Sequence, residues 1–109
     1  MKLVRDNIPS IIEDDRKSCT WRYSNGRDEH MVFLGLKMAE EVQEFLHSPS
    51  LEEAADMYEV LLAMIQLSGH DFDVVVKTAS AKRFARGGFG KGIILKGVND
   101  ENEDAQREI

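Results

Sequence analysis

The sequence predicts an all-α domain of about four helices, organised around a central antiparallel pair of acidic helices. Apolar residues recur at three- and four-residue intervals over two long segments, residues 28–46 and 49–68, as they do on amphipathic helices. Only a four-residue break, His47–Ser50, separates the two segments, and so short a connection favours antiparallel neighbours. A chain of 109 residues is one domain by the usual prior, and we expect that domain to span residues 1–98.

The first expected element lies within residues 2–16, which begin with a short extended piece and continue as a helix. Pro9 is acceptable in the first turn of a helix, where its missing N–H is not needed. Arg5 and Asp6 precede this helix, and two roles are equally open for them: an ion pair that anchors the N-terminus, or a part in a functional site. The apolar edge of the helix consists of Ile8, Ile11 and Ile12.

A loop or short strand is expected next, because residues 20–23 have β-favouring, aromatic character and run into the turn-forming residues 24–26. Trp21 lies in this piece. Its ring is a candidate to stack on a nucleobase, since aromatic faces bind bases with little sequence preference. The commoner place for a lone Trp in a small domain is the core.

The first long helix is expected to begin with Asp28 as its cap and to run to about Leu46. Within it, four residues at intervals of four, three and four form the seam by which a helix faces a packed partner. Glu41 stands in this seam where a core leucine would be expected. The seam residues are Leu34, Met38, Glu41 and Phe45.

The second long helix has two possible starts. Ser48 can cap it with Pro49 in the first position, or Ser50 can cap it with Glu53 closing a capping box. In the second arrangement the Glu53 carboxylate would reach back to Ser50 instead of into a site, so the first start is preferred. We expect the helix to continue to about Ser68.

The last helix is expected to open at Asp71 or Asp73 and to end at the glycine pair 87–88. Lys82 and Arg86 are four residues apart on one face of it. They either interact favourably with the helix C-terminus or bind phosphate.

Beyond this helix, residues 89–95 give a glycine-punctuated loop and a short apolar piece. Residues 99–109 are polar and strongly acidic, a composition that predicts a mobile tail.

Four carboxylates are expected to converge between the two long helices. Glu53 begins a seam in the second helix equivalent to that of Glu41, while Glu44 and Asp56 each follow three residues later, so that each helix offers two carboxylates side by side. A buried unpaired carboxylate costs several kcal/mol, so a cation must offset these charges. The alternative is that the acidic residues form a solvated helix face.

An all-oxygen ligand set of this kind suits a hard ion, Mg²⁺ or Mn²⁺. Lys37, four residues before Glu41, is either a salt-bridge partner or a phosphate contact.

These acidic residues resemble a family pattern. Glu40, Glu41 and Glu44, followed by Glu53 and Asp56, resemble the E-E-x-x-E and E-x-x-D motifs of the MazG-like, all-α nucleoside triphosphate pyrophosphohydrolases, a superfamily that includes phosphoribosyl-ATP pyrophosphohydrolase.

Two further stretches, KLVRDNIP at residues 2–9 and RGGF at residues 86–89, resemble a small phosphoribosyl-ATP-pyrophosphohydrolase-like branch. The resemblance covers residues 2–95. Only eight residues separate Glu44 from Glu53, fewer than is usual in the superfamily, which implies a tighter hairpin and a narrower substrate pocket.

The resemblance implies hydrolysis of a nucleoside triphosphate between its α and β phosphates. It implies Mg²⁺, with Mn²⁺ as a possible substitute, and Glu40 as a base or extra ligand beside Glu41. Lys82 and Arg86 match a K-x-x-x-R pattern of the resemblance, and the related enzymes are oligomeric, so a homodimer or higher homo-oligomer is expected. The implied ligands are Glu41, Glu44, Glu53 and Asp56.

Two other functions stay open: phosphoribosyl-ATP pyrophosphohydrolase of histidine biosynthesis, and a non-catalytic helical interaction module. Acidic residues at every expected position argue against the second.

Composition bounds the partners and the compartment. A formal net charge of −6 disfavours non-specific nucleic-acid binding, which relies on clustered Lys and Arg. No apolar run approaches the roughly 20 residues that span a bilayer. The single cysteine, Cys19, fits a reducing compartment. We therefore expect a soluble, cytoplasmic protein that binds neither membranes nor nucleic acid.

Overall fold

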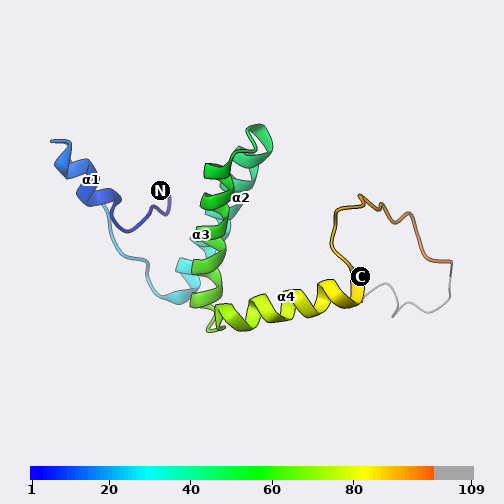
Figure 1. Ribbon diagram of the computed structural model, residues 1–109. Helices are drawn as coiled ribbons and strands as arrows, with labels where there is room; N and C mark the ends of the chain where they lie inside the picture. The colour runs from blue at the N-terminus through cyan, green and yellow to red at the C-terminus, as the bar shows by residue number, and fades with distance from the viewer. Residues whose placement is uncertain (100–109) are drawn as a thin grey trace. The chain divides into compact units, whose positions relative to one another are not determined.

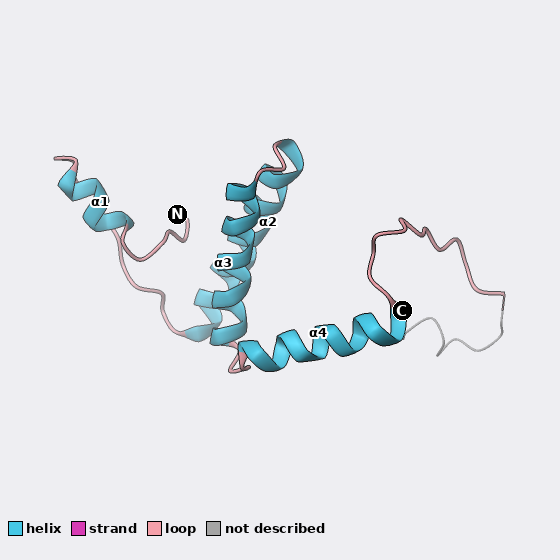
Figure 2. Cartoon of the chain, in the orientation of Figure 1, coloured by secondary structure: helices cyan, strands magenta, loops and turns pink. Residues whose placement is uncertain are grey.

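The computed structural model describes residues 1–99, which form four α-helices and no strand (Figures 1 and 2). The predicted all-α fold class is confirmed for these residues. Apart from Asn99, the predicted acidic tail lies outside them. The helices are α1, Ile8–Asp14; α2, Arg27–His47; α3, Leu51–Leu67; and α4, Phe72–Arg86.

Helix α1 has Pro9 in its first turn, as predicted. The connection to α2 contains no strand, and Trp21 is not a core residue: its side chain is 52% exposed and its ring meets that of Tyr23 edge-on, with centroids 5.0 Å apart. Residues 20–23 are thus a loop, one of the two expected structures.

Helix α2 begins two residues earlier than predicted, at Arg27, and Asp28 lies inside its first turn instead of capping it. The cap position belongs to Gly26, whose φ of 89° and ψ of −178° lie in a backbone region that is essentially restricted to glycine. The side chain that fixes this helix start is Glu29. Its carboxylate accepts a hydrogen bond from the Asn25 N–H at 2.9 Å and one from Arg22 Nη1 at 2.6 Å.

Helix α3 begins at Leu51, and the preferred start at Ser48 and Pro49 is wrong. Ser50 is the cap, because its extended backbone lets its hydroxyl accept a hydrogen bond from the Glu53 N–H at 3.2 Å. The sequence suggested that, with Ser50 as the cap, the Glu53 carboxylate would reach back to Ser50 and be lost to the site, but this does not happen. The backbone N–H of Glu53 serves the cap, and its carboxylate is left to face α2.

Helices α2 and α3 pack side by side and are joined by the three residues 48–50 (Figure 1). Every residue of the α2 seam is buried or half-buried, and so are the residues at the equivalent positions of α3, which are Glu53, Met57, Val60, Met64 and Leu67. Among the described residues the apolar core is small, since only Leu34 on α2 and Ile65 on α3 are buried apolar side chains. The packed seam is therefore what positions the acidic residues within it.

Residues 1–77 form one compact unit, and the chain from Thr78 onwards forms a second unit, which is described by itself. Asp71 opens α4 by accepting a hydrogen bond from the Asp73 N–H at 2.8 Å. Gly87, with φ of 85°, ends it as predicted. Within residues 1–99, no helix has both the length and the apolar character needed to cross a membrane.

Candidate metal centre

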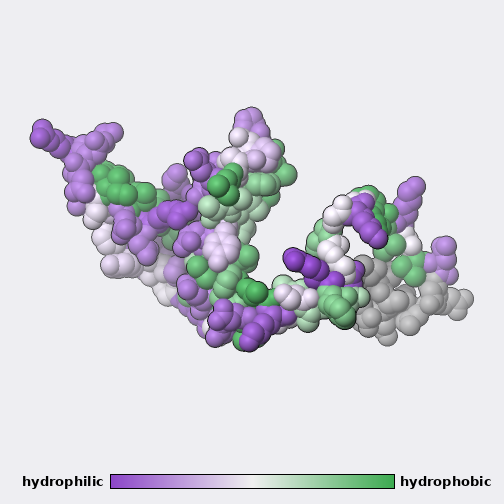
Figure 3. Space-filling view, viewed as in Figure 1, coloured by the Kyte–Doolittle hydropathy of each residue, from purple (hydrophilic) through white to green (hydrophobic). Residues whose placement is uncertain are grey.

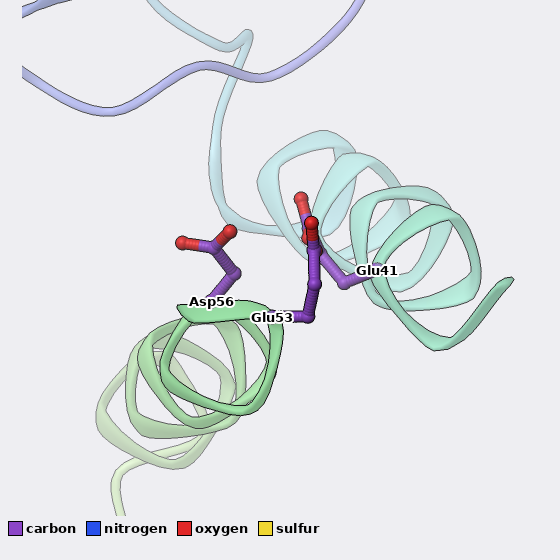
Figure 4. Close-up of side chains that lie close together, drawn as sticks. All are labelled: Glu41, Glu53 and Asp56. Carbon is purple, nitrogen blue, oxygen red and sulfur yellow. The ribbon is translucent and has the colours of Figure 1, made fainter. Parts of the chain in front are cut away.

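Three of the four predicted metal-ligating carboxylates come together between α2 and α3. Glu41 projects from α2, and Glu53 and Asp56 project from α3 (Figure 4). One carboxylate oxygen from each residue lies within 4.8 Å of the other two. Glu53 and Asp56 are three residues apart, so one face of α3 presents both side chains towards Glu41.

Glu41 is a buried charged side chain, with only 4% of its surface exposed. Its Oε2 atom has no hydrogen-bond partner, and neither does Oε2 of half-buried Glu53. A buried acceptor left without a donor costs about 1–3 kcal/mol, and more when it is charged. Both glutamates stand at seam positions that favour an apolar residue. An ion held between them would satisfy both oxygens.

Lys37 is the cation nearest to Glu41. Its Nζ lies 3.3 Å from Oε1 of Glu41, one turn further along α2, and 3.5 Å from Oε1 of Glu40. Burial acts to lower the pKa of Lys37, but the hydrogen bond to Glu41 and the charges of both glutamates outweigh it, so the pKa is raised above its ordinary value. The predicted salt bridge is therefore present. Lys37 is held protonated beside the acidic group, which consists of the carboxylates of Glu41, Glu53 and Asp56.

Arg5 is the second cation at the group. Its Nη2 donates a hydrogen bond to Oδ1 of Asp56 at 2.7 Å, across 51 residues of sequence. Both side chains stay open to solvent, at 56% and 39% exposure. The ion pair that the sequence offered as one role for Arg5 is thus formed, and its partner is one of the candidate metal ligands.

A small pocket of about 170 Å³ lies between the first residues of the chain and α2. Its α2 wall is a single helix face, because its residues recur at intervals of three and four. Lys37 lines this wall and also pairs with Glu41, so the pocket adjoins the acidic group. The lining residues are Met1, Lys2, Leu3, Phe33, Leu36, Lys37 and Glu40.

The other predicted site residues lie outside the three-carboxylate group. Glu44 is exposed on α2, and Glu40, with 40% of its side chain exposed, pairs with Lys37. Trp21 is on the loop before α2. Lys82 and Arg86 are exposed on the part of α4 that belongs to the second unit.

Sequence reasoning missed two contributions from the N-terminal segment, residues 1–7. It did not link Arg5 to Asp56, and it did not assign Lys2 to a pocket. The only signal was the KLVRDNIP stretch, which resembles a branch of the superfamily but does not indicate which residues it contacts. A pairing across 51 residues has no periodic pattern that could reveal it.

The chemistry of the group suits a hard divalent cation. With its three carboxylates ionised, Arg5 and Lys37 leave one negative charge without a partner. All ligand atoms are oxygens, the type that Mg²⁺ and Mn²⁺ prefer. The three residues therefore fit such an ion in charge, ligand type and burial.

Comparison with protein-family models, with curated proteins and with solved structures finds no match to this chain. The membership suggested by the acidic motifs therefore stays a prediction, and the case for a function comes from the acidic group and its surroundings.

Proposed function

We propose that this protein is a metal-dependent nucleoside triphosphate pyrophosphohydrolase that cleaves between the α and β phosphates. The observation that carries the proposal is the unpartnered, buried Oε2 of Glu41, which lies beside Glu53 and Asp56 at the packed face of two helices. A solvated acidic face would not place a carboxylate there. The motif resemblance supports the choice of reaction.

Glu41, Glu53 and Asp56 would hold Mg²⁺ or Mn²⁺. Bound there, the ion supplies positive charge that stabilises phosphate oxygens and makes a water molecule more acidic. Packing fixes the direction of the Glu41 side chain, because its neighbours in the seam are buried or half-buried. The fold therefore pre-organises the ligands, and little ordering of side chains accompanies binding.

Glu40 and Lys37 act next to these ligands. Water attacks the α-phosphorus, the bond from that phosphorus to the bridging oxygen breaks, and pyrophosphate leaves. Glu40 is the candidate to accept the proton that the water loses, since its carboxylate is partly exposed and shares the Lys37 ammonium with Glu41. Lys37, protonated and next to both glutamates, would bind a phosphate oxygen.

Three residues outside the group are further candidates for substrate binding. The cations of Lys82 and Arg86, one turn apart on α4, suit phosphate oxygens. Trp21, half exposed on its loop, presents a ring on which a base can stack.

We also propose that the active form is a homo-oligomer. Large apolar side chains remain exposed along the α2–α3 pair, and Figure 3 shows green, hydrophobic residues over this pair on the face in view. A second copy would cover it and exclude water from the acidic group. The exposed side chains include Val32, Leu36, Leu46, Leu51, Tyr58 and Leu61. The single cysteine is compatible with activity in a reducing cytoplasm.

The test is pyrophosphate release, measured across standard and modified nucleoside triphosphates with Mg²⁺ or Mn²⁺. We expect release of pyrophosphate and a nucleoside monophosphate in equal amounts. Glu41→Gln should abolish it, because the amide keeps the shape of the side chain and removes its charge. Glu59→Gln, an exposed carboxylate on α3, is the matched control and should keep activity.

Release of single phosphates, or none with any nucleotide, would overturn the assignment. Phosphoribosyl-ATP belongs in the same panel. Its strong preference over every nucleoside triphosphate would identify the histidine-pathway alternative.

A further inference from the structure

The N-terminal segment meets the acidic group from two directions. Arg5 binds Asp56 on α3 at 2.7 Å, while Lys2 and Leu3 line the pocket whose opposite wall on α2 contains Lys37. The segment therefore contributes cations beside both helices that carry the carboxylates. If the N-terminal segment served only to anchor the chain, its cations would not need to lie beside the candidate metal ligands.

Arg5 and a metal ion compete for Asp56. A carboxylate has lone pairs enough for several donors, but a guanidinium and a divalent ion on the same carboxylate repel each other. The Arg5 side chain is 56% exposed and so is free to rotate to another partner in the same neighbourhood. Lys37 likewise competes with a metal ion for Glu41, because its ammonium lies 3.3 Å from an oxygen of that candidate ligand.

We propose that Arg5 is a phosphate-binding residue of this site and that it exchanges partners when a metal–phosphate ligand binds. Asp56 passes from Arg5 to the metal, and Arg5 passes from Asp56 to a phosphate oxygen. Lys37 makes the parallel exchange from Glu41. The inference rests on the proposed function, because it assigns the ligand as a polyphosphate carried with its metal.

The exchange conserves charge pairing, which makes it favourable. Before binding, two cations partly neutralise three carboxylates; afterwards a divalent ion offsets two of those three charges, and the two cations offset part of the charge of the phosphate chain. Arginine suits this role better than lysine, since its planar fork can donate two parallel hydrogen bonds to a phosphate.

The test measures two affinities by calorimetry: that of Mn²⁺ alone, and that of inorganic pyrophosphate added to the protein saturated with Mn²⁺. Arg5→Gln should change them in opposite directions. Mn²⁺ should bind about two- to fivefold more tightly, the range expected on removing a competing exposed ion pair. Pyrophosphate should bind about tenfold more weakly, as on losing a charge-assisted hydrogen bond.

Arg22→Gln is the matched control, because Arg22 forms a similar 2.6 Å pair with Glu29 away from the acidic group. It should change neither affinity. Arg5→Lys keeps the charge and should give a pyrophosphate affinity between those of the wild type and Arg5→Gln. Circular dichroism melting confirms that each variant folds, and Arg5→Lys carries the test if Arg5→Gln does not.

Weaker Mn²⁺ binding by Arg5→Gln would show that Arg5 only positions Asp56, and this would overturn the exchange. Unchanged pyrophosphate affinity would overturn it as well. The two proposals fail separately. A protein that shows the opposed affinity changes but hydrolyses no nucleotide keeps the phosphate site and loses the proposed reaction. Hydrolysis that is unaffected by Arg5→Gln keeps the reaction and loses the role of Arg5.

Discussion

Glu41 combines a charged side chain with a position at which packing favours leucine. Lys37 reaches one of its oxygens and no hydrogen bond reaches the other, so the residue is only half satisfied by the protein. In a seam whose other members are apolar, replacing Glu41 by leucine would remove this cost. The free energy that the glutamate costs in the metal-free protein is thus a measure of what the ion must supply.

The Glu53→Gln substitution on α3 tests whether a bound ion supplies the free energy that the buried carboxylates cost. The variant should keep its fold and lose most of the thermal stabilisation by Mg²⁺ or Mn²⁺, because the shape stays while the ligand charge goes. Binding to the folded state alone contributes about 2.7 kcal/mol at one hundred times Kd, which raises Tm by several degrees or more for a chain of this size. Melting curves with and without each ion measure the loss.

Glu52→Gln, at the exposed neighbouring position in the first turn of α3, is the control and should keep the full metal-dependent shift. An unfolded Glu53→Gln protein would instead show that Glu53 is needed for folding.

Lys37 gives a pH prediction. Its folded-state pKa lies above the ordinary 10.5. Its pairing therefore contributes stability in full below pH 10.5 and loses that contribution as pH rises through the folded-state pKa. The difference in Tm between the wild type and Lys37→Met should be largest near pH 9 and shrink towards pH 12. Lys17→Met is the control, because an exposed ion pair such as Lys17–Asp15 contributes little to stability.

At the scale of the elements, periodicity predicted much more than cap chemistry did. The seams of α2 and α3 could be read from the sequence because three- and four-residue spacing is a property of the helix itself. The starts of α2 and α3 could not, since several side chains compete there and only the folded backbone decides which one reaches an N–H. Ser50 and Glu29 decided those starts in place of Ser48 and Asp28.

The start of α3 gives a matched pair of substitutions. Ser50→Ala removes the cap and should destabilise the protein by about 1 kcal/mol, whereas Ser48→Ala, at the exposed alternative cap, should change stability by less than about 0.5 kcal/mol. Urea unfolding of both variants measures the difference. Equal effects would count against Ser50 as the cap.

The candidate site also contains some residues that the sequence could predict and others that it could not. Glu41, Glu53 and Asp56 could be predicted, because helical spacing places them on facing sides of two adjacent helices. Glu44 obeys the same spacing and still falls outside the group, because its position on α2 is exposed. Arg5 could not be predicted, because its contact joins segments that no periodic pattern relates.

For the molecule as a whole, the described residues bury very few apolar side chains. Only Leu34 and Ile65 are buried among them, while Leu36 and Leu61 lie near the middle of the two packed helices with 62% and 44% exposure. A chain with so little apolar burial gains little stability from its own core. Association of two or more copies of the chain would bury the apolar side chains that remain exposed.

We therefore expect light scattering to report a dimer or larger assembly at micromolar concentration, with a Tm that rises with protein concentration. Leu61→Glu should shift the assembly towards monomer, because it places a charge on the exposed apolar surface. Lys77→Glu, at an exposed charged position, is the control. A stable, folded and active monomer on dilution of the wild type would contradict the expectation.

The three-residue connection between α2 and α3 has a consequence for how the protein folds. The two helices that hold the acidic group are neighbours along the chain, so closing the loop between them costs little entropy. Such local contacts form on the fast end of the folding timescale. Glu41 thus meets Glu53 and Asp56 as soon as the helix pair forms, and repulsion among the three carboxylates opposes that early step. A divalent cation in the folding medium would screen the repulsion and speed the pairing, acting on the rate of folding before any substrate is present.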